Sequence, residues 1–417
     1  DVFALLPVTQ RFVFLNDGDI AIVTKEDVQI YDAEGRNVIR NERISESTAE
    51  TPGKCGFRHF MQKEIFEQPK AIDDTLRFQF GKAGNLSESL STEEEEFLKG
   101  IDSVTIVACG TSFHAGLVAK YWIEDLVGIP CGVEVASEFR YRRTAVLPNS
   151  LFVVISQSGE TADSLAALRA ALGLDYRNYL AICNVIESSL TRESGMCILT
   201  RAGPEIGVAS TKAFTTQLVS LLVLALKMRK LKSGIDNDLS KIISDVKLLP
   251  GKIEAILALD KRIAETSERF VNKEHALFLG RGSMYPIAKE GALKLKEISY
   301  IHAEAYPAGE LKHGPLALID EKMPIVVVAP NNHLIDKLHS NLEEVRARGG
   351  HFLIFADSEV DIEVGEGSEI IQLPVVSDIL APICYTIPLQ LFAYHVAVLK
   401  GSDVDQPRNL AKSVTVE

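Results

Sequence analysis

The pattern of apolar and polar positions changes near residue 98 of the chain. Before that point, apolar residues come in short groups broken by polar turns. After it, apolar strand-like runs alternate with stretches of helical periodicity. Strands that alternate with helices are typical of parallel sheets covered by helices. The sequence therefore predicts an α/β body that begins at about residue 98.

The N-terminal part reads as a group of short β segments. Residues 11–15, 19–24 and 27–31 are strand-like and are separated by turn residues, which predicts a meander. Three such strands bury too little surface to be stable alone. We therefore expect this part to be the end of a larger domain, cut at Asp1, and we expect the polar residues 41–54 to be a linker.

The α/β body reads as a duplication, although any two α/β domains share some rhythm of strand, turn and helix. Three strand-like runs recur in the same order, each about 172 residues further along the chain. The paired positions are Ser112 and Ser283, Val154 and Val327, and Ile182 and Ile354.

Two long apolar stretches could be mistaken for membrane spans. Residues 218–226 are too few to cross a bilayer. Residues 380–399 contain two prolines, Gln390 and His395, which are costly in hydrocarbon. We therefore expect both stretches to be buried core segments.

The composition is that of an ordinary globular protein. The 417 residues are 46% hydrophobic, enough for a large core and for two or three domains. With 44 basic against 57 acidic residues the net charge is −13, which argues against a nucleic-acid or anionic-membrane surface. The six cysteines form no metal-ligand pattern, which favours reduced structural thiols in a cytoplasmic protein. They are Cys55, Cys109, Cys131, Cys183, Cys197 and Cys384.

A hydroxyl-rich turn follows the strand-like run 151–155 and precedes the helical stretch 162–172. Its sequence is Ser156-Gln157-Ser158-Gly159-Glu160-Thr161. Backbone N–H groups and the positive end of the dipole at a helix start attract phosphate, although a helix cap that binds nothing has the same composition. No Lys follows Gly159, so this is not the Walker nucleotide loop. The turn favours a small phosphorylated ligand.

The second copy lacks this turn, because residues 329–332 are Ala-Pro-Asn-Asn. It carries instead a predicted helix over residues 290–300, on which Glu290, Lys294 and Glu297 share one face. Such a set is acid/base machinery if it is buried beside a substrate, and a weak ion-pair ladder if it is exposed. The pattern alone favours the ladder.

Two polar segments near the C-terminus carry further titratable groups. The loop 306–315 holds His313, and the tail 405–417 holds Lys412. His313 could titrate near neutral pH, and Lys412 could form an imine if it is desolvated. A lone loop histidine or tail lysine is more often simply solvated.

Taken together, these segments resemble the glutamine–fructose-6-phosphate aminotransferases, also called glucosamine-6-phosphate synthases. The resemblance covers essentially the whole chain and rests on residues 109–112, 156–161, 207–214, 290–304, 309–316 and 407–417. It implies two tandem sugar-isomerase (SIS) domains, each a parallel sheet flanked by helices, preceded by a short β remnant of a glutaminase domain. The catalytic cysteine of that glutaminase domain is exposed at the family's mature N-terminus, so none of the six cysteines here takes its role.

The resemblance implies the following order along the chain. Residues 1–48 are the end of the glutaminase domain and the start of a linker, 49–97 the linker and connecting helices, 98–238 the first SIS domain with the phosphate anchor, 239–268 a connecting helix, 269–408 the second SIS domain with the catalytic base, and 409–417 an active-site tail.

The family converts fructose 6-phosphate and glutamine to glucosamine 6-phosphate and glutamate, and the resemblance implies this activity without a metal or organic cofactor. By similarity, Glu297 moves a proton between C1 and C2, Lys294 assists that transfer, and Lys412 forms an imine with the open-chain ketone. His313 assists ring opening from a neighbouring subunit, which implies at least a homodimer. The sugar phosphate is held, by similarity, by Thr111, Ser112, Ser156, Gln157, Ser158 and Thr161, in a pocket lined by Val208, Ser210 and Ala411.

Two other functions use the same double domain. A non-catalytic sugar-phosphate sensor has no use for Glu297, His313 and Lys412 together. An amino-sugar deglycase has no reason to carry a glutaminase remnant. Both remain open at this point, with fructose 6-phosphate and glucosamine 6-phosphate as the expected ligands and with neither nucleic acid nor membrane as a partner.

Overall fold

The computed structural model describes residues 5, 8–44, 53–81, 86 and 90–415. It divides into two compact units, residues 1–53 and 54–417. The expected boundary between the β remnant and the linker, at residues 48 and 49, lies outside the described residues.

The first unit contains two small antiparallel sheets. Its strands are β1 (Arg11–Val13), β2 (Ile20–Val23), β3 (Val28–Tyr31), β4 (Asn37–Val38) and β5 (Glu42–Ile44). Strands β2, β3 and β4 form a meander, whereas β1 pairs with β5, with Phe12 opposite Arg43. The prediction of one meander followed by a linker from residue 41 was therefore wrong. The polar sequence of β5 gave no sign of a strand. Its backbone pairs with β1, and its Glu42 side chain forms an ion pair with Arg11 of β1 at 2.6 Å.

The second unit begins with three helices and continues into a five-stranded parallel sheet in the order β10-β9-β8-β6-β7. The elements are α2 (Phe60–Phe66), α3 (Gln68–Phe80), α4 (Thr92–Leu98), β6 (Ser103–Ala108), α5 (Gly110–Trp122), the π-helix η1 (Ile123–Val127), β7 (Cys131–Val135), α6 (Ala136–Phe139), β8 (Ser150–Ser156), α7 (Ala162–Ala171), β9 (Asn178–Cys183), α8 (Ser189–Glu193), β10 (Met196–Leu199) and α9 (Lys212–Ser233).

Three helices and a short 3₁₀ turn join this sheet to a second one. They are α10 (Asn237–Lys247), α11 (Leu249–Leu257), α12 (Asp260–Ser267) and η2 (Glu268–Phe270). The sequence led us to expect one helix over residues 239–268. Pro250 lies in the first turn of α11, where its missing N–H is tolerated, and it therefore begins a new helix.

The second sheet is also parallel, in the order β12-β11-β13-β14-β15. Its elements are β11 (His275–Gly280), α13 (Met284–Ser299), β12 (His302–Pro307), the 3₁₀ turns η3 (Ala308–His313) and η4 (Pro315–Leu318), β13 (Pro324–Ala329), α14 (Ile335–Arg346), β14 (His351–Asp357), β15 (Glu369–Leu373) and α15 (Ala381–Leu399).

The two sheets have the same topology, which confirms the duplication. In each sheet the first strand lies between the second and the third, and the fourth and fifth follow in order. The strands that contain Val154 and Val327 are both the third of their sheet, next to the first. A chance similarity of short apolar runs would not reproduce the full strand order.

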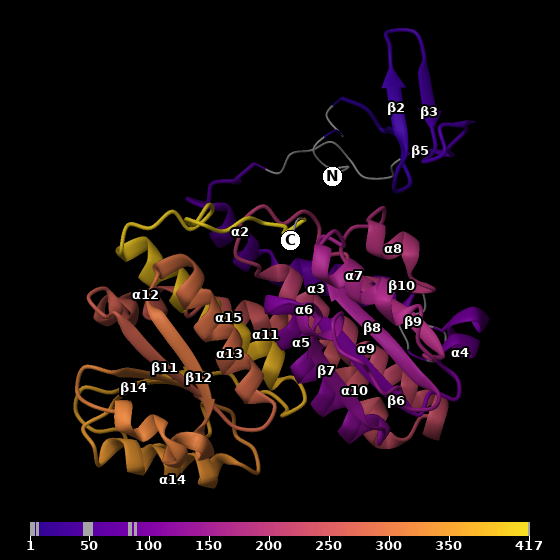
Figure 1. Ribbon diagram of the computed structural model, residues 1–417. Helices are drawn as coiled ribbons and strands as arrows, with labels where there is room; N and C mark the ends of the chain where they lie inside the picture. The colour runs from indigo at the N-terminus through magenta and orange to yellow at the C-terminus, as the bar shows by residue number, and fades with distance from the viewer. Residues whose placement is uncertain (1–4, 6–7, 45–52, 82–85, 87–89, 416–417) are drawn as a thin grey trace. The chain divides into compact units, whose positions relative to one another are not determined.

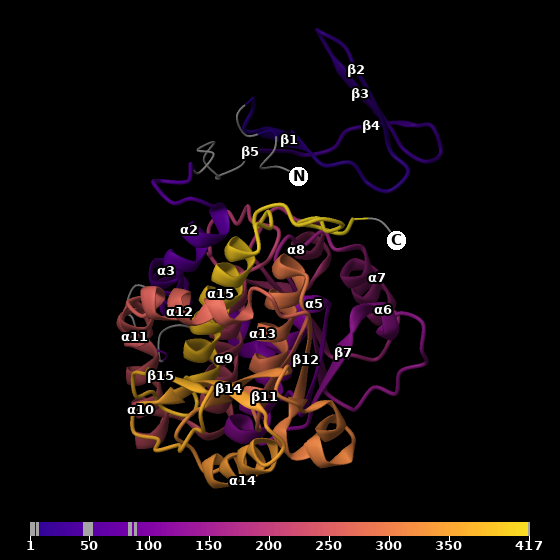
Figure 2. The same cartoon turned by 90° about the vertical axis from the view of Figure 1, so that its left-hand side faces the viewer.

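One continuous core joins the inner faces of the two sheets. Side chains alternate along the strands, so Ile106 packs inward toward α5 and α9 while Val107 packs outward toward α6 and α7. In the second sheet Phe278 faces α13 and α15, and Leu277 faces α14. Figures 1 and 2 show α13 and α15 between the two sheets.

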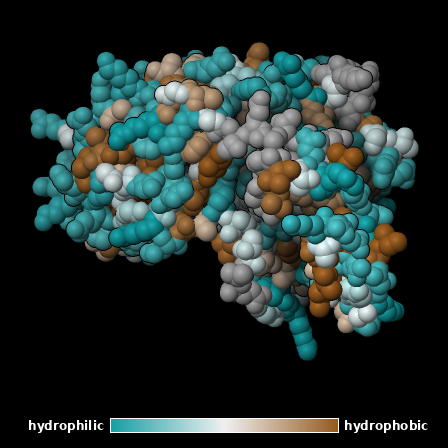
Figure 3. Space-filling model, turned by 90° about the horizontal axis from the view of Figure 1, so that it is seen from above, coloured by the Kyte–Doolittle hydropathy of each residue, from teal (hydrophilic) through white to brown (hydrophobic). Residues whose placement is uncertain are grey.

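The two apolar stretches are core helices, as predicted. Residues 218–226 lie in the buried part of α9. Among the described residues one helix, α15, has the length and apolar composition of a membrane span, and 83% of the relevant window is buried inside the protein. Figure 3 shows one face of the molecule, on which hydrophilic residues predominate and hydrophobic ones gather in small groups.

Cys109, Cys131, Cys183, Cys197 and Cys384 are free thiols, as expected. Burial raises the pKa of Cys131, Cys197 and Cys384 to about 12. A thiol with so high a pKa carries almost no thiolate near neutral pH and is a poor nucleophile.

Candidate functional site

The hydroxyl-rich turn lies between β8, which ends at Ser156, and α7, which begins at Ala162. The Ser156 hydroxyl accepts the N–H of Gly159 at 3.0 Å and lies 3.2 Å from the hydroxyl of Thr161, the N-cap residue of α7. The strand-to-helix position predicted for this turn is therefore confirmed. Hydrogen bonds between its own residues thus close the turn.

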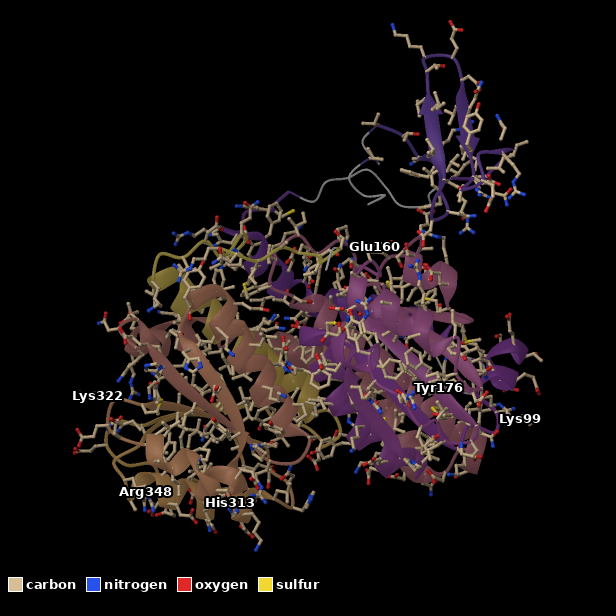
Figure 4. All side chains as sticks on the ribbon, in the orientation of Figure 1. Lys99, Glu160, Tyr176, His313, Lys322 and Arg348 are labelled. Atoms are coloured by element: carbon tan, nitrogen blue, oxygen red, sulfur yellow. The ribbon has the colours of Figure 1, made fainter. Side chains whose placement is uncertain are left out.

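Two further contacts fix the shape of this turn. Ser158 accepts the N–H of Glu160 at 3.2 Å, and Glu160, labelled in Figure 4, accepts the N–H of Ser189 at 2.7 Å. Gly159 has φ +68°, and a Cβ there would lie 2.0 Å from the Ser188 hydroxyl oxygen. Glycine is therefore required at this position for both conformation and space.

The turn lies at a topological switch point. Strands β6 and β8 are neighbours, with Ala108 beside Ile155, although β7 comes between them in the chain. In open α/β sheets ligands bind in the crevice at the carboxyl ends of such strands. Thr111 and Ser112 occupy the first turn of α5, directly after β6. The sheet thus brings them to the same edge as Ser156.

A charged set from the second copy is buried on α13. The Lys294 ammonium lies 2.6 Å from Glu297 Oε2 and 3.4 Å from Glu290 Oε1. Lys294 and Glu290 are each only 1% exposed, and 21% of the Glu297 side chain is exposed. The expectation of a surface ion-pair ladder was wrong, because this face of α13 packs against α5 instead of facing water.

The same set is bonded to the first copy. Lys294 Nζ donates to Thr111 Oγ1 at 3.0 Å, and Thr111 in turn donates to Glu290 Oε1 at 3.1 Å. Glu290 Oε2 lies 2.7 Å from His114 Nδ1 on α5. A candidate acid/base group therefore lies against a candidate substrate-holding residue.

Lys294 is held as a cation. Its burial alone would lower its pKa, but attraction to Glu297 and Glu290 outweighs burial and raises the pKa. A lysine in this state cannot accept a proton. Of the pair, only Glu297 can serve as a base.

The C-terminal tail contacts the hydroxyl-rich turn, and its yellow trace in Figure 1 ends in the region of α7. The Ser413 hydroxyl lies 3.1 Å from that of Ser158, and the carbonyl of Val414 accepts the N–H of Ala162 at 3.0 Å. The first N–H of α7, which the sequence pattern assigned to phosphate binding, thus donates to the tail in this structure.

The side chain of Lys412 is hydrogen-bonded to the turn that precedes α9. Its ammonium donates to Glu205 Oε2 at 2.5 Å and to the Gly207 carbonyl at 2.8 Å. Glu205 also accepts the N–H groups of Thr211 and Ala213 at 2.9 and 3.0 Å. Burial opposes ionisation of Glu205, but the charge of Lys412 and these hydrogen bonds outweigh it and lower the pKa of Glu205 to about 2.

The remaining predicted pocket residues lie in the turn before α9, in the tail and in the hydroxyl-rich turn. Ser210 donates to Glu205 at 2.9 Å, and the N–H of Val208 donates to the carbonyl of Asp405 at 3.1 Å. Ala411 is exposed, next to Lys412 in the tail. Gln157 is half-buried in the hydroxyl-rich turn, and its carbonyl accepts the N–H of Asn184 at 3.3 Å.

His313 is the one predicted site residue that does not join the others within this chain. It is exposed at the end of η3 in the second SIS-like half. Figure 4 shows it at the far end of the molecule from Glu160.

Three acid or imidazole groups of this region were missed in the sequence. Glu205, His114 and Glu64 each form a hydrogen bond to a residue of another element far away in the sequence. No spacing pattern in the sequence marks such contacts. Only the position of Glu205, just before the conspicuous Gly207–Phe214 segment, offered a signal. Among the described residues no group of three His, Cys, Asp or Glu side chains could hold a metal ion.

Comparison with known proteins decides the family. The SIS domain model matches residues 97–227 and 269–400. The glutamine–fructose-6-phosphate aminotransferase (isomerizing) of Pseudomonas aeruginosa is 57% identical over 421 residues, which span 100% of this chain and 68% of that protein. The chain belongs to the glutamine–fructose-6-phosphate aminotransferase family.

Other members of the aminotransferase family agree. The Escherichia coli protein of the same name is 57% identical over 420 residues, again covering 100% of this chain and 68% of that protein. The C-terminal domain of the Francisella tularensis enzyme superposes with a TM-score of 0.82 at 51% identity, covering 85% of this chain and 100% of that one. The predicted architecture of two tandem SIS domains is therefore confirmed.

Proposed function

We propose that this chain carries the ketose–aldose isomerase half of an enzyme that converts fructose 6-phosphate and glutamine to glucosamine 6-phosphate and glutamate. The observation that carries the proposal is the contact between the Glu297–Lys294 pair of one SIS domain and Thr111 of the other. A candidate base, a fixed cation and the hydroxyl of Thr111, one of the proposed sugar-phosphate ligands, are linked through this contact. The names of the relatives point to the same reaction.

The reaction moves a carbonyl from C2 of the opened sugar to C1. Glu297 removes the proton from C1, which leaves an enediolate, or an enamine when nitrogen has replaced the oxygen on C2, and the negative charge that develops needs a cation nearby. Glu297 then delivers the proton to C2 while the hydroxyl proton of O1 moves to the oxygen or nitrogen on C2, which leaves the carbonyl at C1. Lys294 stays charged beside it at 2.6 Å and stabilises that developing charge. Lys294 also assists proton transfer through this ion pair.

The hydroxyl-rich turn holds the phosphate end of the substrate in this proposal. Ser156, Ser158, Thr161 and the start of α7 offer neutral donors, and Thr111 and Ser112 offer two more from α5. Since the Val414 carbonyl and the Ser413 hydroxyl already contact the turn, substrate binding requires the tail to adjust.

Lys412 would form an imine with the C2 ketone, and ammonia would then replace the lysine. The residue after this lysine, Ser413, contacts the hydroxyl-rich turn, so a sugar held there by its phosphate has the amine close by.

His313 would assist ring opening in the site of a neighbouring subunit, because it lies away from the other groups within its own chain. The assembly is then a homodimer or a higher homo-oligomer. A cytoplasmic location and a role in amino-sugar synthesis follow from the proposed substrates.

Incubation with fructose 6-phosphate tests the proposal. The chain should produce glucose 6-phosphate without glutamine, which a coupled dehydrogenase assay measures. A sugar-phosphate sensor would bind fructose 6-phosphate without converting it. An amino-sugar deglycase would instead release ammonia from glucosamine 6-phosphate and leave fructose 6-phosphate unchanged.

A further inference from the structure

Glu64 is a buried carboxyl that none of the roles above uses. It lies on α2 and is 2% exposed. Its Oε1 accepts the N–H of Ile206 at 2.5 Å and of Gly207 at 3.2 Å. The turn that contains these two peptides is the one whose Glu205 side chain and Gly207 carbonyl hold the ammonium of Lys412. Gly207 therefore links the two side chains, because its N–H donates to Glu64 and its carbonyl accepts from the Lys412 ammonium.

The other oxygen of Glu64, Oε2, accepts no hydrogen bond among the described residues. It is buried, and a Cβ added to Gly207 would lie only 2.9 Å from it. A buried carboxylate oxygen without a donor is costly, whereas a protonated one removes the charge. Protonation of the Glu64 carboxylate at Oε2 would therefore be favourable.

The surrounding segments are tied together by Asp405 at the base of the tail. Its carboxylate accepts the N–H groups of Phe60 and Met61 at the start of α2, both at 2.9 Å. Its backbone carbonyl accepts the N–H of Val208 at 3.1 Å. Helix α2, the turn before α9 and the tail thus form one cluster, although they lie far apart in the sequence.

We propose that Glu64 is a positioning residue for Lys412, which holds the turn that seats the tail amine and takes up one proton when that amine loses its positive charge. The inference rests on the proposed function, in which Lys412 forms an imine. The step balances: the Lys412 ammonium gives up one proton, its nitrogen forms the C=N bond with the C2 carbonyl, water leaves, and the carboxylate of Glu64 gains one proton.

The charges around Glu64 favour this exchange. Burial and the nearby carboxylate of Glu205 raise the pKa of Glu64 to about 7, while the charge of Lys412 lowers it. Because the coupling is reciprocal, loss of the Lys412 charge increases the affinity of Glu64 for a proton. The proton that leaves the lysine then stays in the pocket.

Other groups on the packed elements are already engaged. On and beside α2, Lys63 lies 3.3 Å from Glu67, which also accepts from Lys212 of α9 at 2.7 Å. On α15, the Tyr394 hydroxyl bonds the His59 ring at 2.9 Å. Asp405 faces the start of α2. Glu205 and Lys412 are the two charges that govern Glu64 most directly.

Reductive trapping tests the proposal. The chain is mixed with fructose 6-phosphate and cyanoborohydride between about pH 6 and 8.5, and the adduct on Lys412 is measured by peptide mass spectrometry. The wild-type rate should rise as Glu64 ionises near pH 7. Glu64→Gln keeps an oxygen for the two N–H groups, so we expect KM within about twofold of wild type, with trapping about tenfold slower above pH 7 and without that rise.

Two variants act as controls. Glu64→Ala also removes the acceptor of the turn, so it should raise KM as well as slow trapping. Glu254→Gln, at an exposed carboxylate of α11, should leave rate, KM and pH profile unchanged. A wild-type rate and pH profile in Glu64→Gln overturns the inference. Glucose 6-phosphate formation by the wild type without any adduct on Lys412 overturns instead the imine role, and no glucose 6-phosphate at all overturns the proposed function.

A measurement on the wild type alone guards against a variant that does not fold. Calorimetry of fructose 6-phosphate binding in two buffers of different ionisation enthalpy counts the protons released. At about pH 7.5 the uptake by Glu64 should leave the net release close to zero. Release of a full proton at each site contradicts the inference.

Discussion

Lys294 Nζ donates a 3.0 Å hydrogen bond to Thr111 Oγ1, although the two residues belong to different copies of the duplicated domain. The contact joins α13, which carries the candidate base, to α5, which begins at the same sheet edge as the hydroxyl-rich turn. Each copy alone has the strands of a SIS domain, but only their packing brings the Glu297–Lys294 pair to Thr111. The following predictions test this arrangement and its connection to the tail.

Glu297→Gln should stop isomerisation while leaving binding nearly intact. The amide keeps the shape of the side chain but cannot accept the C1 proton, so we expect a loss of about 10²–10⁴-fold in kcat. Solvent-deuterium incorporation at C1 and C2 is the measurement. Unchanged incorporation refutes the role of Glu297, and Glu254→Gln, at an exposed carboxylate, serves as the matched control.

Ser158→Ala should weaken the binding of fructose 6-phosphate. The substitution removes a neutral donor to a charged phosphate, which is worth about 1.5–3 kcal/mol. Titration calorimetry measures the change in Kd, and Ser233→Ala at the exposed end of α9 is the control. Equal affinity of the two variants counts against the phosphate anchor.

Gly159→Ala should damage the same anchor through the backbone. Alanine at φ +68° is strained, and its Cβ would meet Ser188 Oγ at 2.0 Å and Cys183 Sγ at 2.8 Å. We expect a lower melting temperature together with weaker binding. Gly132→Ala, on the edge strand β7 with no atom within 4 Å of the added Cβ, should change neither.

Glu205→Gln should alter the stability of the chain in acid. The folded-state pKa of Glu205, about 2, lies below its ordinary value of 4.5, so its contribution to stability is present above pH 4.5 and is lost as the pH falls toward 2. The stability difference between wild type and Glu205→Gln should therefore shrink over that range. Urea unfolding at several pH values measures it, and a constant difference argues against the Glu205–Lys412 pair.

Mixed oligomers should reveal whether His313 acts across subunits. His313→Ala and Glu297→Gln should each be inactive alone. A co-expressed mixture should regain activity, because one site of a hybrid dimer combines the intact Glu297 of one chain with the intact His313 of the other. No recovery in hybrids isolated by two different tags means that His313 does not serve a neighbouring site.

The local features of the fold could be read from the sequence. A buried parallel strand that leads into a helix leaves a continuous apolar run, a turn and a 3.6-residue pattern within about 20 residues, and the second copy repeats them. The hydroxyl-rich turn after β8 and the shared face of Glu290, Lys294 and Glu297 are local in the same sense. The sequence pattern therefore determined the fold class and the duplication, and the resemblance to a known family assigned the roles of the candidate residues.

Only the tertiary structure decided what those residues face. Helical spacing places Glu290, Lys294 and Glu297 on one face, but burial of that face depends on α5, whose contacting residues lie 176 to 183 residues earlier in the chain. The same holds for Glu64 and Glu205 around Lys412, and for the pairing of β1 with β5. Such contacts depend on packing across the whole chain, because the free energy of a carboxylate is set by the charges, donors and water around it and not by its neighbours in sequence.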